Sequence, residues 1–437
     1  MSRRWIAVLD TVALFLVAAT AGWALAAPVA EQTGIAGTEG ELRQLMTSRP
    51  LAAAVGLVLA VAVAGALARR GSRAAAYLVA GSGLVVLSVG ALVNTHAHQL
   101  EWLIALSYLA GIGAGIAMGG AAAVAADRYA AAALVAGAFA SFLLADLVAN
   151  PIPYGQSSDY QGWTAYSLPA TEGTMVTDPP WWLLLPALGC CVAGAALATG
   201  SATAPAGASR RPLYAIAIVI VTGLASNAVL AEHRSDWSVA APVLALVMVA
   251  IVIAAFLLDG RDGVFLLTAA AALAASAPLV VGVGTEWIGI AIMLALLLAG
   301  AAVGSRWANP TLGLVLLAVN AAAGLVWPND ASAVEAIRYL ALAPIAGYAF
   351  ASAVPRRAAS IPVGLSVLFV PSALTVAGQS NSSVHWDQLS VFDDLPRGML
   401  GSTPPDPFAL SLAMTLVILA CAEAAHRLRR RDPTPSP

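Results

Sequence analysis

The sequence predicts an all-α integral membrane protein with about fourteen transmembrane helices, built as two pseudo-symmetric six-helix bundles plus a two-helix insertion. Three observations support this prediction. Hydrophobic residues make up 60% of the 437 positions and charged residues only 10%, and the mean hydropathy of +0.84 is far above that of soluble domains. Apolar runs long enough to cross about 30 Å of hydrocarbon recur along the chain. Two loops with one residue pattern occur at equivalent places in the two halves.

Hydropathy places about fourteen spans along the chain. Each run has the roughly 20 predominantly apolar residues that a membrane helix needs. The expected spans are 5–27, 50–68, 74–94, 102–126, 129–149, 181–200, 213–231, 238–258, 263–283, 286–304, 309–326, 337–353, 360–377 and 407–426.

Arginine supplies all 21 basic residues, because the chain contains no lysine. If the N-terminus is cytoplasmic, sixteen arginines fall inside and only five fall outside, namely Arg43, Arg49, Arg234, Arg338 and Arg397. This asymmetry agrees with the positive-inside rule, so we expect both termini to be cytoplasmic. The alanine and arginine bias suggests a bacterial source of high GC content. We therefore expect a multi-pass protein of the bacterial cell membrane.

The repeated loops define the two halves of the chain. "GQSSDYQGW" begins at Gly155 and "GQSNSSVHW" at Gly378, and both are followed by Leu-Pro and then Pro-Pro. Each precedes the last span of a six-span unit, as duplicated transporters would place it. The predicted units are an N-terminal six-helix bundle (1–200), a cytoplasmic linker with an inserted helix pair (201–262), a C-terminal six-helix bundle (263–427) and a basic, proline-containing cytoplasmic tail (428–437).

These loops, 150–180 and 378–406, form two acidic and aromatic surfaces that we expect outside the membrane. Their contact candidates are Asp159, Trp163, Trp386 and Asp387. The surfaces suit an extracytoplasmic protein partner or a glycolipid head group. The alternative is an interfacial aromatic belt flanked by solvated acids.

Three motifs resemble the major facilitator superfamily, specifically its fourteen-span drug:proton antiporter branch. The stretch "GALARRGSR" from Gly65 to Arg73 resembles the loop motif between spans 2 and 3, although its Asp is missing. Span 4 carries the glycine pattern of the family, but Ser107 stands where the family has an arginine associated with proton coupling. "VLDTVALFLVAA" resembles the span 1 signature, which favours retention of span 1 over its removal as a signal peptide. The family's span 5 Gly-Pro motif is absent.

The resemblance implies a transporter with a gating loop at the cytoplasmic surface and with close helix packing around span 4. The absent arginine puts proton antiport in doubt. The packing residues implied are Gly111, Gly113 and Gly115. The gating residues implied are Gly65, Arg69, Arg70, Gly71 and Arg73, together with Asp127 and Arg128 at the end of span 4.

Four polar residues within the spans are the candidates for proton coupling or transport. Ionisable and polar groups are costly in hydrocarbon, so they are candidates for function. Asp10 is the carboxylate best placed to titrate, and the others are Asp146, Asn227 and Asn320. The alternatives are a carboxylate that reaches the interface and asparagines that hold neighbouring helices together.

No catalytic, cofactor or metal-binding pattern emerges from the sequence. Cys190, Cys191 and Cys421 all fall within spans, and His96 and His98 lack further ligands at suitable spacing. No nucleic-acid role is indicated. One enzymatic alternative is a polyprenyl-phosphate-sugar glycosyltransferase, for which Glu39 and Glu41 would be acids of the first outer loop.

The sequence therefore favours a non-enzymatic transporter that works by alternating access. Few ionisable residues are available to line its path, so a small hydrophobic or amphipathic cargo, including a lipid, is expected to move through it. The surrounding bilayer is the other expected partner. The main alternative is a membrane scaffold in cell-envelope processes that has kept the fold and lost the coupling residues.

Overall fold

Fourteen α-helices account for nearly all described residues of the computed structural model, and each overlaps one predicted span. The structure describes residues 3–26, 39–94, 100–125, 127–149, 179–198, 209–232, 237–277, 279, 287–326, 332–374 and 407–431. The helices are α1 (Arg3–Ala26), α2 (Glu39–Arg70), α3 (Arg73–Asn94), α4 (Leu100–Val124), α5 (Arg128–Ala149), α6 (Trp181–Leu197), α7 (Arg211–Glu232), α8 (Trp237–Leu257), α9 (Gly260–Ser276), α10 (Trp287–Arg306), α11 (Pro310–Val326), α12 (Ser332–Ala353), α13 (Ser360–Phe369) and α15 (Pro407–Arg431).

Ten of these helices are long and apolar enough to cross a membrane, counted over the described residues. Three further apolar helices, α6, α11 and α13, are shorter. A chain of this kind satisfies its backbone hydrogen bonds within each helix, as hydrocarbon requires. The prediction of an all-helical, multi-pass membrane protein is confirmed.

The two largest differences between predicted and observed boundaries have identifiable reasons. Helix α2 begins at Glu39, not at residue 50, because charged residues lower the hydropathy of a first turn without preventing helix formation. Glu39 and Glu41 therefore start a helix and do not form a loop. Helix α13 ends at Phe369, not at residue 377. Pro371 has no N–H to donate to the carbonyl of Val367, so the helix cannot continue.

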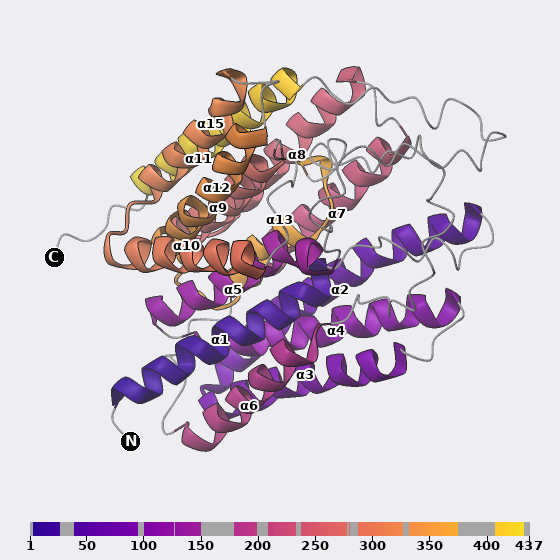
Figure 1. Cartoon of the computed structure of the whole chain (residues 1–437), viewed down its shortest axis with the longest axis vertical. Coiled ribbons are helices and arrows are strands. Elements are labelled where there is room, and N and C mark those ends of the chain that lie inside the picture. The colour runs from indigo at the N-terminus through magenta and orange to yellow at the C-terminus, as the bar shows by residue number, and fades with distance from the viewer. Residues whose placement is uncertain are drawn as a thin grey trace.

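The helices form two sets that pack in the same pattern. In the first set, α1 contacts α4, α5 and α6, α2 contacts α4, and α3 contacts α4 and α6. In the second set, α9 contacts α12, α13 and α15, α10 contacts α12, and α11 contacts α12 and α15. Figure 1 shows the first set, α1–α6, in indigo to magenta below the orange and yellow helices of the second. The exact bounds of the predicted units stay a prediction.

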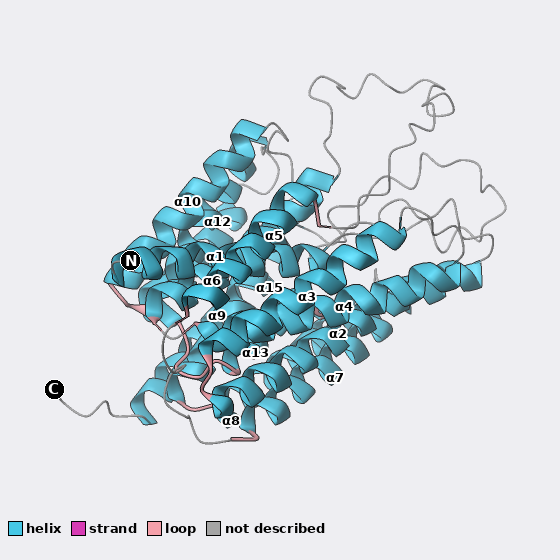
Figure 2. Ribbon diagram, turned by 90° about the horizontal axis from the view of Figure 1, so that it is seen from below, coloured by secondary structure: helices cyan, strands magenta, loops and turns pink. Residues whose placement is uncertain are grey.

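Helices α7 and α8 form the extra pair and pack against each other. Helix α7 also contacts α2 and α13, and α8 contacts α9 and α15, so the pair lies beside both helix sets. The helices lean along a common direction in Figure 2, and α1 begins at the same end of the bundle at which α15 ends. We call it the arginine-rich end, because Arg73, Arg128 and Arg211 begin helices there and Arg429–Arg431 end one.

Small residues set the helix spacing within each set. A Cβ atom added at Gly111 would collide with the carbonyl of Ala52 on α2, and one at Gly115 would collide with that of Gly56. Gly113 faces Gly83 of α3. In the second set, Gly300 and Gly304 of α10 meet the backbone of α12 in the same way. Close backbone approach of this kind is a usual route to helix association in membranes.

Gly71 connects α2 to α3 with a φ of 65°, a left-handed conformation that glycine adopts without strain. We expect Gly71→Ala to lower the free energy of unfolding by about 1 kcal/mol. Gly65→Ala, inside α2 and with no atom within 4 Å of the added Cβ, should raise it by up to about 1 kcal/mol. Denaturation of the purified variants in mixed micelles checks both signs, and equal effects would contradict this reading of the turn.

Candidate functional site

The two helix sets meet along a seam where α5 contacts α10 and α12, and α13 contacts α2 and α5. Its centre is aromatic. Phe139 of α5 lies 5.1 Å from Phe350 of α12, measured between ring centroids, and Phe350 lies 5.9 Å from Phe265 of α9. Phe142 and Phe369 form an edge contact at 6.4 Å. The middle of the seam is therefore an apolar surface shared by both sets.

At the arginine-rich end, Arg128 bonds the first set to the second. Its Nη2 donates to the carbonyl oxygens of Gly304 at 2.8 Å and Ala351 at 3.3 Å. Both carbonyls lie in the last turn of their helices, which carries partial negative charge. Asp127 accepts the N–H of Ala130 at 2.8 Å and so caps the start of α5. The predicted gating pair thus lies at the seam.

At the opposite end, Tyr339 of α12 donates its hydroxyl to the carbonyl oxygen of Leu143 on α5 at 3.0 Å. Both residues are buried. Leu143 follows Arg128 by 15 positions on the same helix, which is about 22 Å of helix length. The seam is therefore hydrogen-bonded near both ends, with the phenylalanines between them.

Asp10 lies between α1 and α3, where Arg73 and Tyr77 hold it. Its carboxylate forms an ion pair with Arg73 and accepts a hydrogen bond from the Tyr77 hydroxyl. Asp10 is only 4% exposed, so the pair replaces most of its hydration. The contact joins two helices of one set. This geometry gives Asp10 a role in helix packing.

Asn320 and Asn227 lie on α11 and α7, apart from the helices whose contacts define the seam. Asn320 is buried on α11 with its side-chain Nδ2 unpartnered among the described residues, and Asn227 is half-buried on α7. The side chain of Asp146 lies outside the described residues. So do Asp159, Trp163, Trp386 and Asp387, and also His96 and His98.

Among the gating-loop residues, Arg69 and Arg70 are exposed at the end of α2. Arg73 is the one whose ion pair is described above. The loop glycines serve the turn and the helix end, as given for Gly71 and Gly65.

Arg338, which the sequence places on the outer side, lies buried between two helices of the second set. Arg338 belongs to α12 and is only 6% exposed. Its Nε donates to the carbonyl of Asn320 at 3.1 Å, and its Nη2 to that of Ala321 at 3.4 Å. Burial of this charge is tolerated because the two backbone carbonyls accept hydrogen bonds from the guanidinium group.

Two carboxylates that sequence reasoning missed organise the arginine-rich end. Asp262, 2% exposed, accepts the backbone N–H of Arg356 and the hydroxyl of Ser360, each at 2.7 Å. Asp259 forms ion pairs with Arg211 and Arg357. The stretch "DGRDG" resembled an ordinary polar connection, yet two acids beside a helix start could have indicated a capping role.

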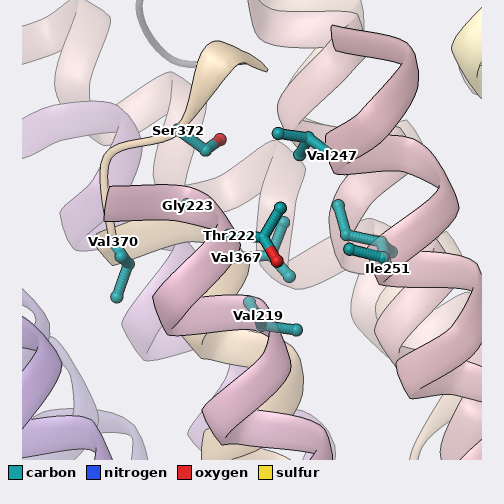
Figure 3. A pocket seen from close by; sticks show the side chains of 9 residues that line it. Val219, Thr222, Gly223, Val247, Ile251, Val367, Val370 and Ser372 are labelled. Atoms are coloured by element: carbon teal, nitrogen blue, oxygen red, sulfur yellow. The ribbon is translucent and has the colours of Figure 1, made fainter. Parts of the chain in front are cut away.

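A small pocket lies away from the seam, between α7, α8 and the end of α13 (Figure 3). Its walls are mostly Val and Ile, with Thr222 and Ser372 as polar members. Ser226 of α7 accepts the N–H of Ala373 at 3.0 Å, which satisfies backbone freed where α13 ends. The cavity volume is about 10 Å³, enough for about one water molecule. It is too small to hold a cargo molecule.

No protein-family model matches the sequence, and no curated protein matches it. Among solved structures, the proton:xylose symporter XylE is similar, with 12% identity, a TM-score of 0.50 and coverage of 96% of this chain and 95% of that one. An auto-inhibited peptide transporter of the POT family has 12% identity, a TM-score of 0.50 and coverage of 99% and 98%. The fucose:proton symporter FucP of E. coli follows with 12% identity, a TM-score of 0.48 and coverage of 99% of both chains.

The likeness to XylE and to the peptide transporter extends over nearly the whole chain, while the sequences share few residues. It therefore concerns the arrangement of helices and not the cargo. The fourteen-span antiporter branch stays a prediction. Together with the two similarly packed helix sets, the likeness shows that the chain has the fold of the major facilitator superfamily transporters.

Proposed function

We propose that the chain is a membrane transporter that moves a small hydrophobic or amphipathic molecule along the seam by alternating access. The observation that carries this proposal is that the seam is hydrogen-bonded near both ends and apolar between them. Arg128 bonds one end of the seam and Tyr339 the other. Because few hydrogen bonds hold each end of the seam, either end can open at a modest cost in free energy while the other stays closed.

The cargo class follows from the aromatic centre of the seam. Phe139, Phe265 and Phe350 offer rings and no charge. Opening of either end would expose these rings to an apolar or amphipathic molecule, which they would bind by area burial and stacking. A sugar or a charged amino acid would need polar partners there. Lipids and lipid-like molecules are therefore the favoured cargo.

Orientation and partners complete the proposal. The arginine-rich end faces the cytoplasm of a bacterial cell and both termini lie there, by the positive-inside rule. The segments 150–180 and 378–406 would then lie outside the membrane, near the opposite end of the seam, where a protein partner or a glycolipid head group can reach them. Their structure lies outside the described residues, so this part rests on the sequence.

A test uses proteoliposomes and a fluorescent short-chain lipid analogue as the probe. In a chain without Cys190, Cys191 and Cys421, cysteines replace Tyr129 and Arg306, which are exposed on α5 and α10 at the arginine-rich end. We expect a bifunctional thiol reagent to stop probe movement and cleavage of the reagent to restore it. The matched control bridges cysteines at Arg69 and Tyr129, both within the first set, and should leave movement unchanged.

One observation favours the second candidate, a non-transporting scaffold. Ser107 donates its hydroxyl to the carbonyl of Leu103 in its own helix at 2.9 Å, so it makes no coupling contact in this state. Asp10 is held by Arg73 and Tyr77. If the probe moves no faster than in protein-free vesicles while envelope proteins still co-purify with the chain, the scaffold is correct and the transporter is not.

A further inference from the structure

Four arginines from four segments gather where the seam reaches the arginine-rich end. We call Arg128, Arg261, Arg356 and Arg429 the seam arginine cluster. Arg261 of α9 donates to the carbonyl of Ser352 at 3.5 Å, next to the Ala351 carbonyl that Arg128 binds. Its charge also interacts with those of the other three members. Arg128 and Arg261 thus bind neighbouring carbonyls at the C-terminal end of α12, while Arg429 donates to the hydroxyl of Thr311 on α11 at 2.8 Å.

Negative charge around this cluster is sparse. Asp262 interacts with Arg261, but its oxygens are already engaged by the N–H of Arg356 and the hydroxyl of Ser360. Asp259 pairs with Arg211 and Arg357 outside the cluster. The end of α12 adds only about half a negative charge. Asp127 directly precedes Arg128, but it already caps the start of α5. The main charge interactions of Arg261 are thus with three arginines and one carboxylate.

Local geometry strengthens the attraction for an anion. Arg128 and Arg261 are half-buried, so their mutual repulsion is screened less than it would be in water. The Nε of Arg128 is buried and has no hydrogen-bond partner among the described residues. Helices α5, α9 and α13 also begin here, and their first N–H groups carry partial positive charge. Arg356 and Arg429 are exposed, which leaves the cluster open to solvent or lipid.

We propose that the seam arginine cluster binds a phosphate group and that the bound phosphate holds the two helix sets together at this end. Several oxygens and a negative charge let one phosphate group accept hydrogen bonds from several guanidinium groups at once. Arg128 belongs to the first set, whereas Arg261, Arg356 and Arg429 belong to the second or its connections. The site lies beyond the proposed cargo path, and binding there does not depend on transport.

The phosphate can come from an anionic lipid head group or from solution, and two probes separate these sources. The full chain is placed in nanodiscs of phosphatidylcholine with or without phosphatidylglycerol, and separately in detergent with inorganic phosphate at constant ionic strength. The readout is the thermal unfolding midpoint. We expect at least one probe to stabilise the protein, with an apparent affinity that falls about tenfold in Arg261→Gln and in Arg356→Gln.

Arg430→Gln is the matched control, because Arg430 is exposed on α15 directly after Arg429 and its loss changes the net charge equally. If Arg261→Gln does not fold, Arg356→Gln and Arg429→Gln carry the test. Stabilisation by phosphatidylglycerol alone assigns a lipid head group, and stabilisation by inorganic phosphate assigns a soluble one. Equal loss of affinity in Arg430→Gln, or no stabilisation by either probe, overturns the proposal.

Discussion

Asp10→Ala is expected to lower the free energy of unfolding by about 3 kcal/mol, because it leaves the partly buried Arg73 charge without its partner. The Nε of Arg73 already lacks a hydrogen-bond partner among the described residues, and the Tyr77 hydroxyl would lose its acceptor as well. Denaturant titration of the purified variant in mixed micelles measures the change.

The double variant Asp10→Ala with Arg73→Ala should be less destabilised than Asp10→Ala alone, because it removes the unpaired charge. Glu423→Ala is the control, since its ion pair with Arg427 is exposed on α15 and its loss should not be measurable. If the double variant is no better than the single one, the buried pair does not explain the role of Asp10.

Arg128→Ala is expected to open the seam at the arginine-rich end. It removes charge-assisted hydrogen bonds to the carbonyls of Gly304 and Ala351. A loss of about 2 kcal/mol would change the ratio of closed to open forms roughly thirtyfold. Reactivity of a cysteine placed at Ala351, now buried against Arg128, should rise accordingly when an impermeant thiol reagent is applied.

Arg69→Ala controls for the loss of a positive charge at the same end, because Arg69 is exposed on α2. It should leave the reactivity at position 351 unchanged. An equal rise in both variants would mean that the seam responds to overall charge and not to the contacts of Arg128.

The sequence was most informative where a property depends on composition alone. Hydropathy located every described helix, because crossing hydrocarbon needs only a run of apolar residues. Pro371 could have indicated the early end of α13, but the apolar residues on both sides of it extend the hydropathy run past the end of the helix. The packing role of the α4 glycines could also be predicted, since few other residues permit such close backbone contact.

Tertiary partners were far harder to predict. Asp10 and Arg73 are 63 positions apart, and the residues around either one do not indicate the other as its partner. Arg128 could be predicted as a latch from its place at a helix end, but its acceptors are backbone carbonyls, which every helix offers. Arg338 shows the same limit, because its partners on α11 exist only once α11 and α12 pack together.

Paired distance measurements across the two ends of the seam test the central claim most directly. Spin labels at Tyr129 and Arg306 report the arginine-rich end, and labels at Glu101 of α4 and Ile337 of α12 report the opposite end, all four sites being exposed. Alternating access predicts two distance populations at each end, with Arg128→Ala enriching the long distance at the first pair and the short one at the second. Tyr339→Phe should do the reverse, by about fivefold for one neutral hydrogen bond. A single, unchanged distance at both ends in all three proteins would contradict the account.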